Sequence, residues 1–216
     1  MKSNWIDHAL CAIAIACVLA ASCGAVIALQ PLSALLGRYQ PLADAAALPI
    51  AYGLLSAAAV AAMLKLRPMP CGEHSMDSPA ATYWKLITVL YRLGQGALGW
   101  CTPFFMRPVL DALFGARIGS QLAFGGAIDD PYMVSIGDRV VLGNASLVTG
   151  NYLSGGKLVC HPVRIGADVT IGANAIVMPG STVGERAVVV SGSVVMPGTS
   201  IPAGETWRGN PARKWL

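Results

Sequence analysis

The side chains best suited to chemistry in this 216-residue sequence are a histidine and an amide in one short segment. His161 is the last of three histidines, and an imidazole can accept a proton near neutral pH because its pKa lies close to that pH. Asn151, ten residues earlier, does not titrate usefully, but its amide can hydrogen-bond a substrate carbonyl. Three roles are open for His161: a general base, a structural residue, or a ligand contact without proton transfer.

Two neighbouring carboxylates, Asp129 and Asp130, come directly before a proline. The simplest interpretation is a turn, and binding of an acceptor substrate is the alternative. A metal centre is not expected, because the surrounding region holds a single histidine and no pair of cysteines has the C-x-x-C spacing of a zinc site. The net charge of +4 is too small to predict nucleic-acid binding, and no phosphate-binding G-x-x-x-x-G-K-[ST] loop is present.

The segments that must position these residues repeat every six residues, a period that neither a helix nor an ordinary strand has. The repeating aliphatic residues are Ile165, Ile171, Val177, Val183, Val189, Val195 and Ile201. The same spacing recurs earlier, at Ile118, Phe124, Ile136, Leu142 and Val148. This pattern predicts a β-solenoid, in which each short strand puts one aliphatic residue into a stacked core before the chain turns. The repeat is interrupted between Val148 and Val163, so Asn151 and His161 are expected on a loop that leaves the coil.

Three segments, IGDRVVLGNAS (136–146), VRIGADVTIGANAIVMPGSTVGERAVVVSGSVVMPGTSIP (163–202) and WRGNPARKWL (207–216), resemble the hexapeptide-repeat acyltransferases. The resemblance implies a left-handed parallel β-helix, mainly β in class, over about residues 117–216. It also implies acetyl-CoA as acyl donor and a homotrimer with the donor groove between neighbouring subunits. Relatives carry the histidine that acts as general base just after the early coils, where this chain has Gly150 and Asn151.

The same resemblance implies the residues that contact the donor. The pantetheine arm is expected near Ser191 and Gly192, and the closing segment is expected to line the groove and hold the CoA phosphates. That segment contributes Arg208, Gly209, Asn210, Pro211, Arg213 and Lys214. The retained G-N-P-A-R motif favours an enzyme, and the missing early histidine favours a noncatalytic trimeric scaffold.

The front of the chain is unusually apolar. Hydrophobic residues make up 55% of the whole sequence and charged residues 12%, and two uncharged runs, 9–29 and 45–64, are each long enough to span a bilayer as a helix. We therefore expect residues 1–67 to form a two-helix transmembrane hairpin. Lys2 before it and Lys65 and Arg67 after it predict that both ends face the cytoplasm. Structural disulfides are not expected on that side of the membrane.

Residues 68–116 are expected to connect the membrane to the coil. Residues 69–80 are typical of a linker, and 82–93 and 100–114 are predicted helices that either cap the first coil or lie at the membrane interface. This stretch also resembles members of the family from bacterial surface-polysaccharide and peptide-synthetase clusters. The sequence thus predicts a multi-pass O-acetyltransferase of the bacterial cytoplasmic membrane, with its coil in the cytoplasm and a membrane-associated glycan, lipid or peptide as acceptor.

Overall fold

The computed structural model describes residues 5–215 and divides the chain into two compact units, which we describe separately. The helical unit comprises Met1–Met69 and Asp77–Pro103, and the coil unit comprises Pro70–Met76 and Phe104–Leu216. The interval 68–116, expected as a separate connector, thus contributes to both units.

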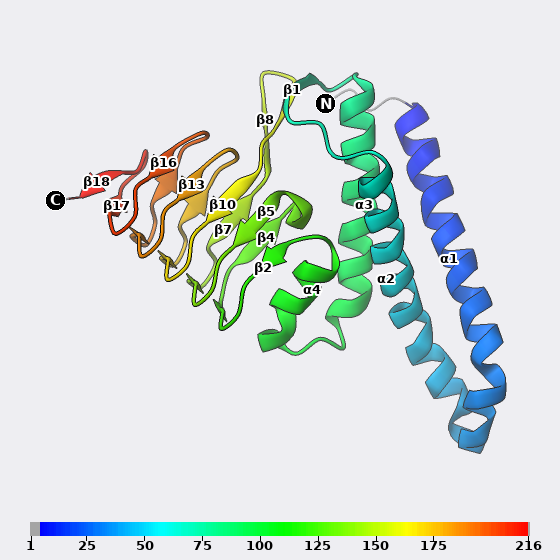
Figure 1. Ribbon diagram of the computed structural model, residues 1–216. Helices are drawn as coiled ribbons and strands as arrows, with labels where there is room; N and C mark the ends of the chain where they lie inside the picture. The colour runs from blue at the N-terminus through cyan, green and yellow to red at the C-terminus, as the bar shows by residue number, and fades with distance from the viewer. Residues whose placement is uncertain (1–4, 216) are drawn as a thin grey trace. The chain divides into compact units, whose positions relative to one another are not determined.

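The helical unit begins with two apolar helices that run antiparallel (Figure 1). They are α1 (Trp5–Ser33) and α2 (Gln40–Leu66), joined by the short helix η1 (Ala34–Tyr39), in which the chain reverses at Gly37 with a left-handed φ of 55°. Within Trp5–Leu66 the most apolar window has a mean hydropathy of 2.6 and is only 17% buried, so the stretch is long and apolar enough to cross a membrane. By length and composition the stretch Trp5–Leu66 counts as one candidate membrane span. This finding supports one span and not the two separate spans expected from the sequence.

The third helix, α3 (Pro79–Gly99), packs against both others. It begins at Ser78, whose side chain caps it by accepting a hydrogen bond from the Ala81 backbone nitrogen at 3.2 Å. A largely buried ion pair joins Lys85 in the second turn of α3 to Asp7 in the first turn of α1 at 2.5 Å, and Thr82 donates to the same carboxylate. The buried residues of α3 are Ala81, Ile87, Leu90, Tyr91, Gly94 and Leu98. One face of α3 therefore belongs to the core of the helical unit.

The coil unit is a parallel β-solenoid with three faces, each built from strands that pair in parallel from one coil to the next. The first face contains β2 (Arg117–Ile118), β5 (Val134–Ile136), β10 (Val163–Ile165), β13 (Thr182–Val183) and β16 (Ser200–Ile201). The second contains β3 (Ala123–Phe124), β6 (Val141–Leu142), β11 (Thr170–Ile171), β14 (Val188–Val189) and β17 (Thr206–Arg208), with β18 (Arg213–Trp215) antiparallel at its end. The third contains β4 (Ala127–Asp129), β7 (Leu147–Thr149), β12 (Ile176–Val177) and β15 (Val194–Val195). This architecture fits the expected left-handed β-helix.

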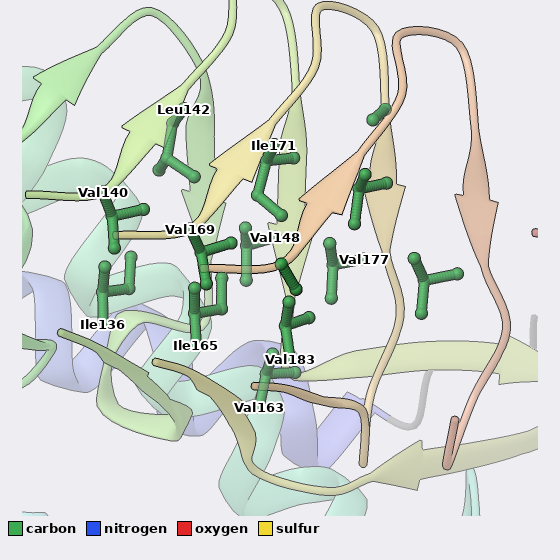
Figure 2. Packing of buried hydrophobic residues seen from close by; sticks show 14 of the residues in the cluster. Ile136, Val140, Leu142, Val148, Val163, Ile165, Val169, Ile171, Val177 and Val183 are labelled. Carbon is green, nitrogen blue, oxygen red and sulfur yellow. The ribbon is translucent and has the colours of Figure 1, made fainter. Parts of the chain in front are cut away.

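The core of the solenoid is the predicted stack of aliphatic residues (Figure 2). Val177 is 0% exposed and lies between its register partners Val148 and Val195 on the third face. All seven residues of the six-residue repeat from Ile165 to Ile201 are buried in the same cluster. The register predicted from the sequence is therefore confirmed for these coils.

The six-residue repeat is also interrupted before Ile136. On the third face the register partner of Val148 is Ile128, which follows Phe124 by only four residues. The turn after β4 is correspondingly longer and holds the short helix η3 (Pro131–Met133). The repeat is therefore interrupted twice, and the expectation of a single interruption was wrong. The longer turn after β4 compensates for the short step before it and restores the register by Ile136.

The interruption between Val148 and Val163 is a β-hairpin. Its strands β8 (Asn151–Ser154) and β9 (Lys157–Cys160) are joined by two glycines with left-handed φ angles, 56° at Gly155 and 74° at Gly156. A further strand, β1 (Gly72–Ser75), pairs antiparallel with β9. Residues 72–75, expected as linker, are thus the third strand of a small sheet.

The start of the solenoid is preceded by two short helices, η2 (Phe104–Met106) and α4 (Arg107–Leu113). Helix α4 contacts β2, and Phe114 directly after it is buried. This segment therefore packs on the first coil, as the cap alternative predicted for residues 100–114.

Candidate active site

The base of the hairpin brings Asn151 and His161 together. Asn151 is the register partner of Cys160, and the backbone nitrogen of His161 donates to the carbonyl of Gly150 at 3.0 Å. The hairpin begins at Asn151 and ends at Cys160, directly before His161. Both predicted catalytic residues thus lie where the hairpin leaves the turn between the third and first faces, which we call the hairpin corner.

Asp130 organises this corner from inside the protein. It is 0% exposed and has a left-handed backbone with φ of 53°, consistent with the predicted turn. Its carboxylate accepts hydrogen bonds from the Asn151 amide nitrogen and from the Tyr132 hydroxyl, the latter at 3.1 Å. Because a buried carboxylate needs such partners, Asp130 is better suited to hold Asn151 in place than to bind an acceptor. The Asp129 backbone carbonyl accepts from Gly150 at 3.3 Å.

His161 is half-buried on an edge of the coil. A Cβ added to Gly180 would lie 3.3 Å from the His161 Cβ and 3.4 Å from the Gly198 nitrogen, so these three residues stack on successive coils at the hairpin corner. Within residues 5–215 the His161 imidazole makes no hydrogen bond. The half-buried imidazole is therefore accessible from outside the coil.

Cys160 lies beside His161 and was not singled out by its sequence. It is fully buried, and burial, with the nearby charges of Asp130 and Cys71, raises the pKa of its thiol to about 12. A thiol with such a pKa is protonated at neutral pH and is a poor nucleophile. The corner therefore does not support a covalent cysteine intermediate.

The predicted donor residues meet at a different corner, the turn between the second and third faces. Two hydrogen bonds hold Gly209 there: its nitrogen donates to the Ser193 hydroxyl at 3.1 Å, and its carbonyl accepts from Val194 at 2.9 Å. The Ala212 nitrogen donates to the Val194 carbonyl at 2.8 Å, and the bond between Asn210 and Pro211 is cis. These bonds hold the loop 209–212 against Ser193 and Val194, which directly follow Ser191 and Gly192 in the chain. We call this the loop corner.

The three cationic side chains of the closing segment differ in their contacts. The Arg208 guanidinium lies over the Trp215 ring, 4.5 Å from its centroid. Lys214 donates to Glu205 at 2.7 Å, and this hydrogen bond is the main reason why the pKa of Glu205 lies below its usual value. Arg213 is exposed and has no carboxylate partner in the described part of the chain. Arg213 is therefore the cation best placed to meet a phosphate.

Within one chain, the hairpin corner and the loop corner lie at some distance from each other. Strand β15 runs from the loop corner at Ser193 toward the hairpin corner at Met196, and His161 belongs to a coil two steps earlier. At about 3.3 Å per residue and about 4.8 Å per coil, the two groups are separated by roughly 10–15 Å. The third face between them is apolar on its outer side, with Leu147, Ile176 and Val194 half-buried.

Comparisons with known proteins agree with this architecture. The family described as bacterial transferase hexapeptide (six repeats) matches residues 162–197. The chain is 31% identical over 115 residues to the delta-poly-L-ornithine synthetase of Acinetobacter baumannii (strain AB307-0294), a match that covers 53% of this chain and 8% of that protein. The chain thus spans under a tenth of the length of this curated relative.

Solved structures similar to the chain include a hexapeptide-repeat acetyltransferase from Vibrio cholerae O1 biovar eltor complexed with acetyl-CoA. It is 29% identical, with 47% of this chain and 60% of that chain covered and a TM-score of 0.43. A galactoside acetyltransferase in complex with coenzyme A is 23% identical, with 58% and 80% covered and a TM-score of 0.48.

A maltose O-acetyltransferase from Clostridium difficile 630 is 21% identical, with 67% and 91% covered and a TM-score of 0.48.

The three-faced coil and the family match together define a hexapeptide-repeat β-solenoid protein. Residues 162–197 match the hexapeptide repeat of bacterial transferases, and they lie within the region whose sequence resembles that family.

Proposed function

We propose that this protein is a membrane-anchored acyltransferase that moves an acetyl group from acetyl-CoA to a hydroxyl or amine. The observation that carries the proposal is the loop 209–212, held by backbone hydrogen bonds beside Ser191 and Gly192 at the end of a transferase hexapeptide repeat. That arrangement offers backbone groups to a pantetheine arm and the exposed guanidinium of Arg213 to a phosphate.

In this proposal His161 is the general base. Its neutral imidazole accepts the proton of the acceptor hydroxyl while the hydroxyl oxygen attacks the thioester carbonyl carbon. Collapse of the tetrahedral intermediate forms the new ester and breaks the carbon–sulfur bond, and the leaving CoA thiolate takes the proton back from the imidazolium. The Asn151 amide, whose nitrogen is turned toward Asp130, would supply a polar contact beside the reacting carbonyl through its remaining groups.

The separation of the two corners supports a homotrimeric arrangement. In one chain His161 and the loop 209–212 lie at opposite ends of the third-face strands, so a transfer between them needs either an extended donor or a neighbouring coil. A second copy packed along the apolar third face would bring its own loop toward the hairpin corner. We therefore place acetyl-CoA between neighbouring coils of a trimer.

The apolar helices support membrane attachment. Two spans formed by α1 and α2 would place the loop around Arg38 outside and both ends of the chain in the bacterial cytoplasm, where acetyl-CoA is available. Lys65 lies in the last turn of α2 and Arg67 directly follows it, and Lys2 lies outside the described residues. An acceptor at the bilayer, such as a lipid-linked glycan, a lipid or a membrane-associated peptide, would suit this anchor.

A reporter fused to the carboxyl terminus is expected to read cytoplasmic in bacterial cells, because the basic residues flank the helix pair on that side. A membrane-impermeant thiol reagent should label a cysteine placed at Arg38 in intact cells. It should not label one placed at Arg186. Labelling of the Arg186 position from outside would reverse the orientation and remove acetyl-CoA as the donor.

A noncatalytic scaffold is the second candidate, favoured by the asparagine at position 151 where relatives have the base. Calorimetric titration of the full chain in detergent with acetyl-CoA separates the two. We expect the wild-type protein to bind, and Arg213→Ala to weaken binding by about tenfold or more, since a hydrogen bond to a charged group is lost. Arg186→Ala, which removes an exposed guanidinium elsewhere, should bind normally. If the wild-type chain does not bind acetyl-CoA, the noncatalytic scaffold is the remaining candidate function.

A further inference from the structure

A small cavity on the first face of the solenoid borders the hairpin corner. Its volume is about 170 Å³, and its lining includes Arg117, Tyr132, Ser135, Pro162 and Arg164. This volume is well below the roughly 300 Å³ at which pockets begin to enclose whole small molecules. The cavity is therefore sized for one group of a larger ligand.

The strand register places two guanidinium groups on either side of a hydroxyl. Ser135 on β5 is the register partner of Arg117 on β2 and of Arg164 on β10. Their neighbours on these strands, Ile136 and Ile165 among them, point into the core, so the two arginines and the serine point outward. The Cα atoms of the arginines are separated by two strand spacings, or roughly 10 Å, a span from which two long side chains can converge.

Unlike Arg139 and Arg186 on the same coil unit, these two arginines have no acidic partner among the described residues. Arg139 donates two hydrogen bonds to Asp168, both at 2.7 Å, and Arg186 lies 4.0 Å from Glu185. Within residues 5–215, neither Arg117 nor Arg164 forms an ion pair. The first face thus presents two uncompensated positive charges around a hydroxyl donor.

We propose that Arg117, Ser135 and Arg164 form an anion subsite that holds a phosphate group of the acceptor. Guanidinium groups bind phosphate through paired, charge-assisted hydrogen bonds, and the serine hydroxyl adds a donor. Pro162 links the cavity to the hairpin corner, because it directly follows His161. The assignment to the acceptor rests on the proposed function: a phosphate held here places the rest of the acceptor beside the proposed base.

Binding of inorganic phosphate to the full chain in detergent, measured by calorimetry at low ionic strength, tests the subsite. Arg117→Ala and Arg164→Ala are each expected to raise the Kd by about tenfold or more, and the double variant should show no measurable binding. Arg164→Lys keeps the charge but loses the paired hydrogen bonds, so its Kd should lie between those of the wild type and Arg164→Ala. Arg186→Ala is the matched control and should bind as the wild type does. Equal affinities in all variants would overturn the proposal.

Acetyl-CoA also carries phosphates, so a competition experiment separates acceptor from donor. If the subsite serves the acceptor, saturating acetyl-CoA leaves the Kd for inorganic phosphate unchanged. Loss of phosphate binding in the presence of acetyl-CoA would assign the cavity to the donor and overturn the proposal. Phosphate binding that persists in a chain unable to bind acetyl-CoA would instead refute the proposed acyl transfer and leave the anion subsite standing.

Discussion

Replacing Val177 by aspartate is expected to unfold the coil unit or destabilise it by at least about 4 kcal/mol. Val177 is 0% exposed and stacks between Val148 and Val195, so the new carboxyl group would be enclosed by aliphatic side chains. Neither water nor a hydrogen-bond donor would reach it, and the two coils that it joins in register would separate. Chemical denaturation of the full chain in detergent, followed by circular dichroism, would measure the loss.

Asp168→Asn is the matched control for this substitution. Asp168 sits at an outer turn with a left-handed φ of 59°, which asparagine adopts readily, and it accepts hydrogen bonds only from the exposed Arg139. We expect a small change in the denaturation midpoint. Comparable losses from Val177→Asp and Asp168→Asn would show that the inward and outward positions of the repeat have been exchanged.

Replacing His161 by alanine is expected to lower kcat/KM for acetyl transfer by about 10²–10⁴, the contribution of a positioned general base. The affinity for acetyl-CoA should survive, because the loop 209–212 lies at the other corner and makes no hydrogen bond to His161. Steady-state kinetics and calorimetry on the same preparation would separate the two effects. Full activity of His161→Ala would exclude it as the base and leave transfer assisted by the substrate itself.

Asn151→His is an informative companion to His161→Ala. The Asn151 amide donates to the buried carboxylate of Asp130, so an imidazole at position 151 would find an anionic partner to orient it. This variant puts a histidine where the family resemblance implies one, and it should regain activity in the background of His161→Ala. Unchanged inactivity would show that the hairpin corner is not the place of proton transfer.

Several features of the fold were predictable because they depend on local pattern. The six-residue spacing from Ile165 to Ile201 has one physical explanation, a coil whose every strand contributes one residue to the core, and the structure confirms it. The break after Val148 likewise predicted a segment outside the coil. The second break was not predictable in this way, because Phe124 and Ile136 are twelve residues apart, a multiple of six. The spacing therefore gives no sign that Ile128 is the core residue between them.

The sequence by itself determined the coil, its register from Ile165 to Ile201, the apolar front and the residues that could do chemistry, because each follows from spacing or side-chain type. Only the tertiary structure decided which of these residues meet. Hydrogen bonding between β8 and β9 closes the hairpin and brings Asn151 beside His161, and β1 joins them from more than seventy residues away in the chain. Parallel stacking placed Arg117 and Arg164 around Ser135, and it separated His161 from the loop 209–212. Such contacts depend on pairing between distant strands, whose partners no local pattern specifies.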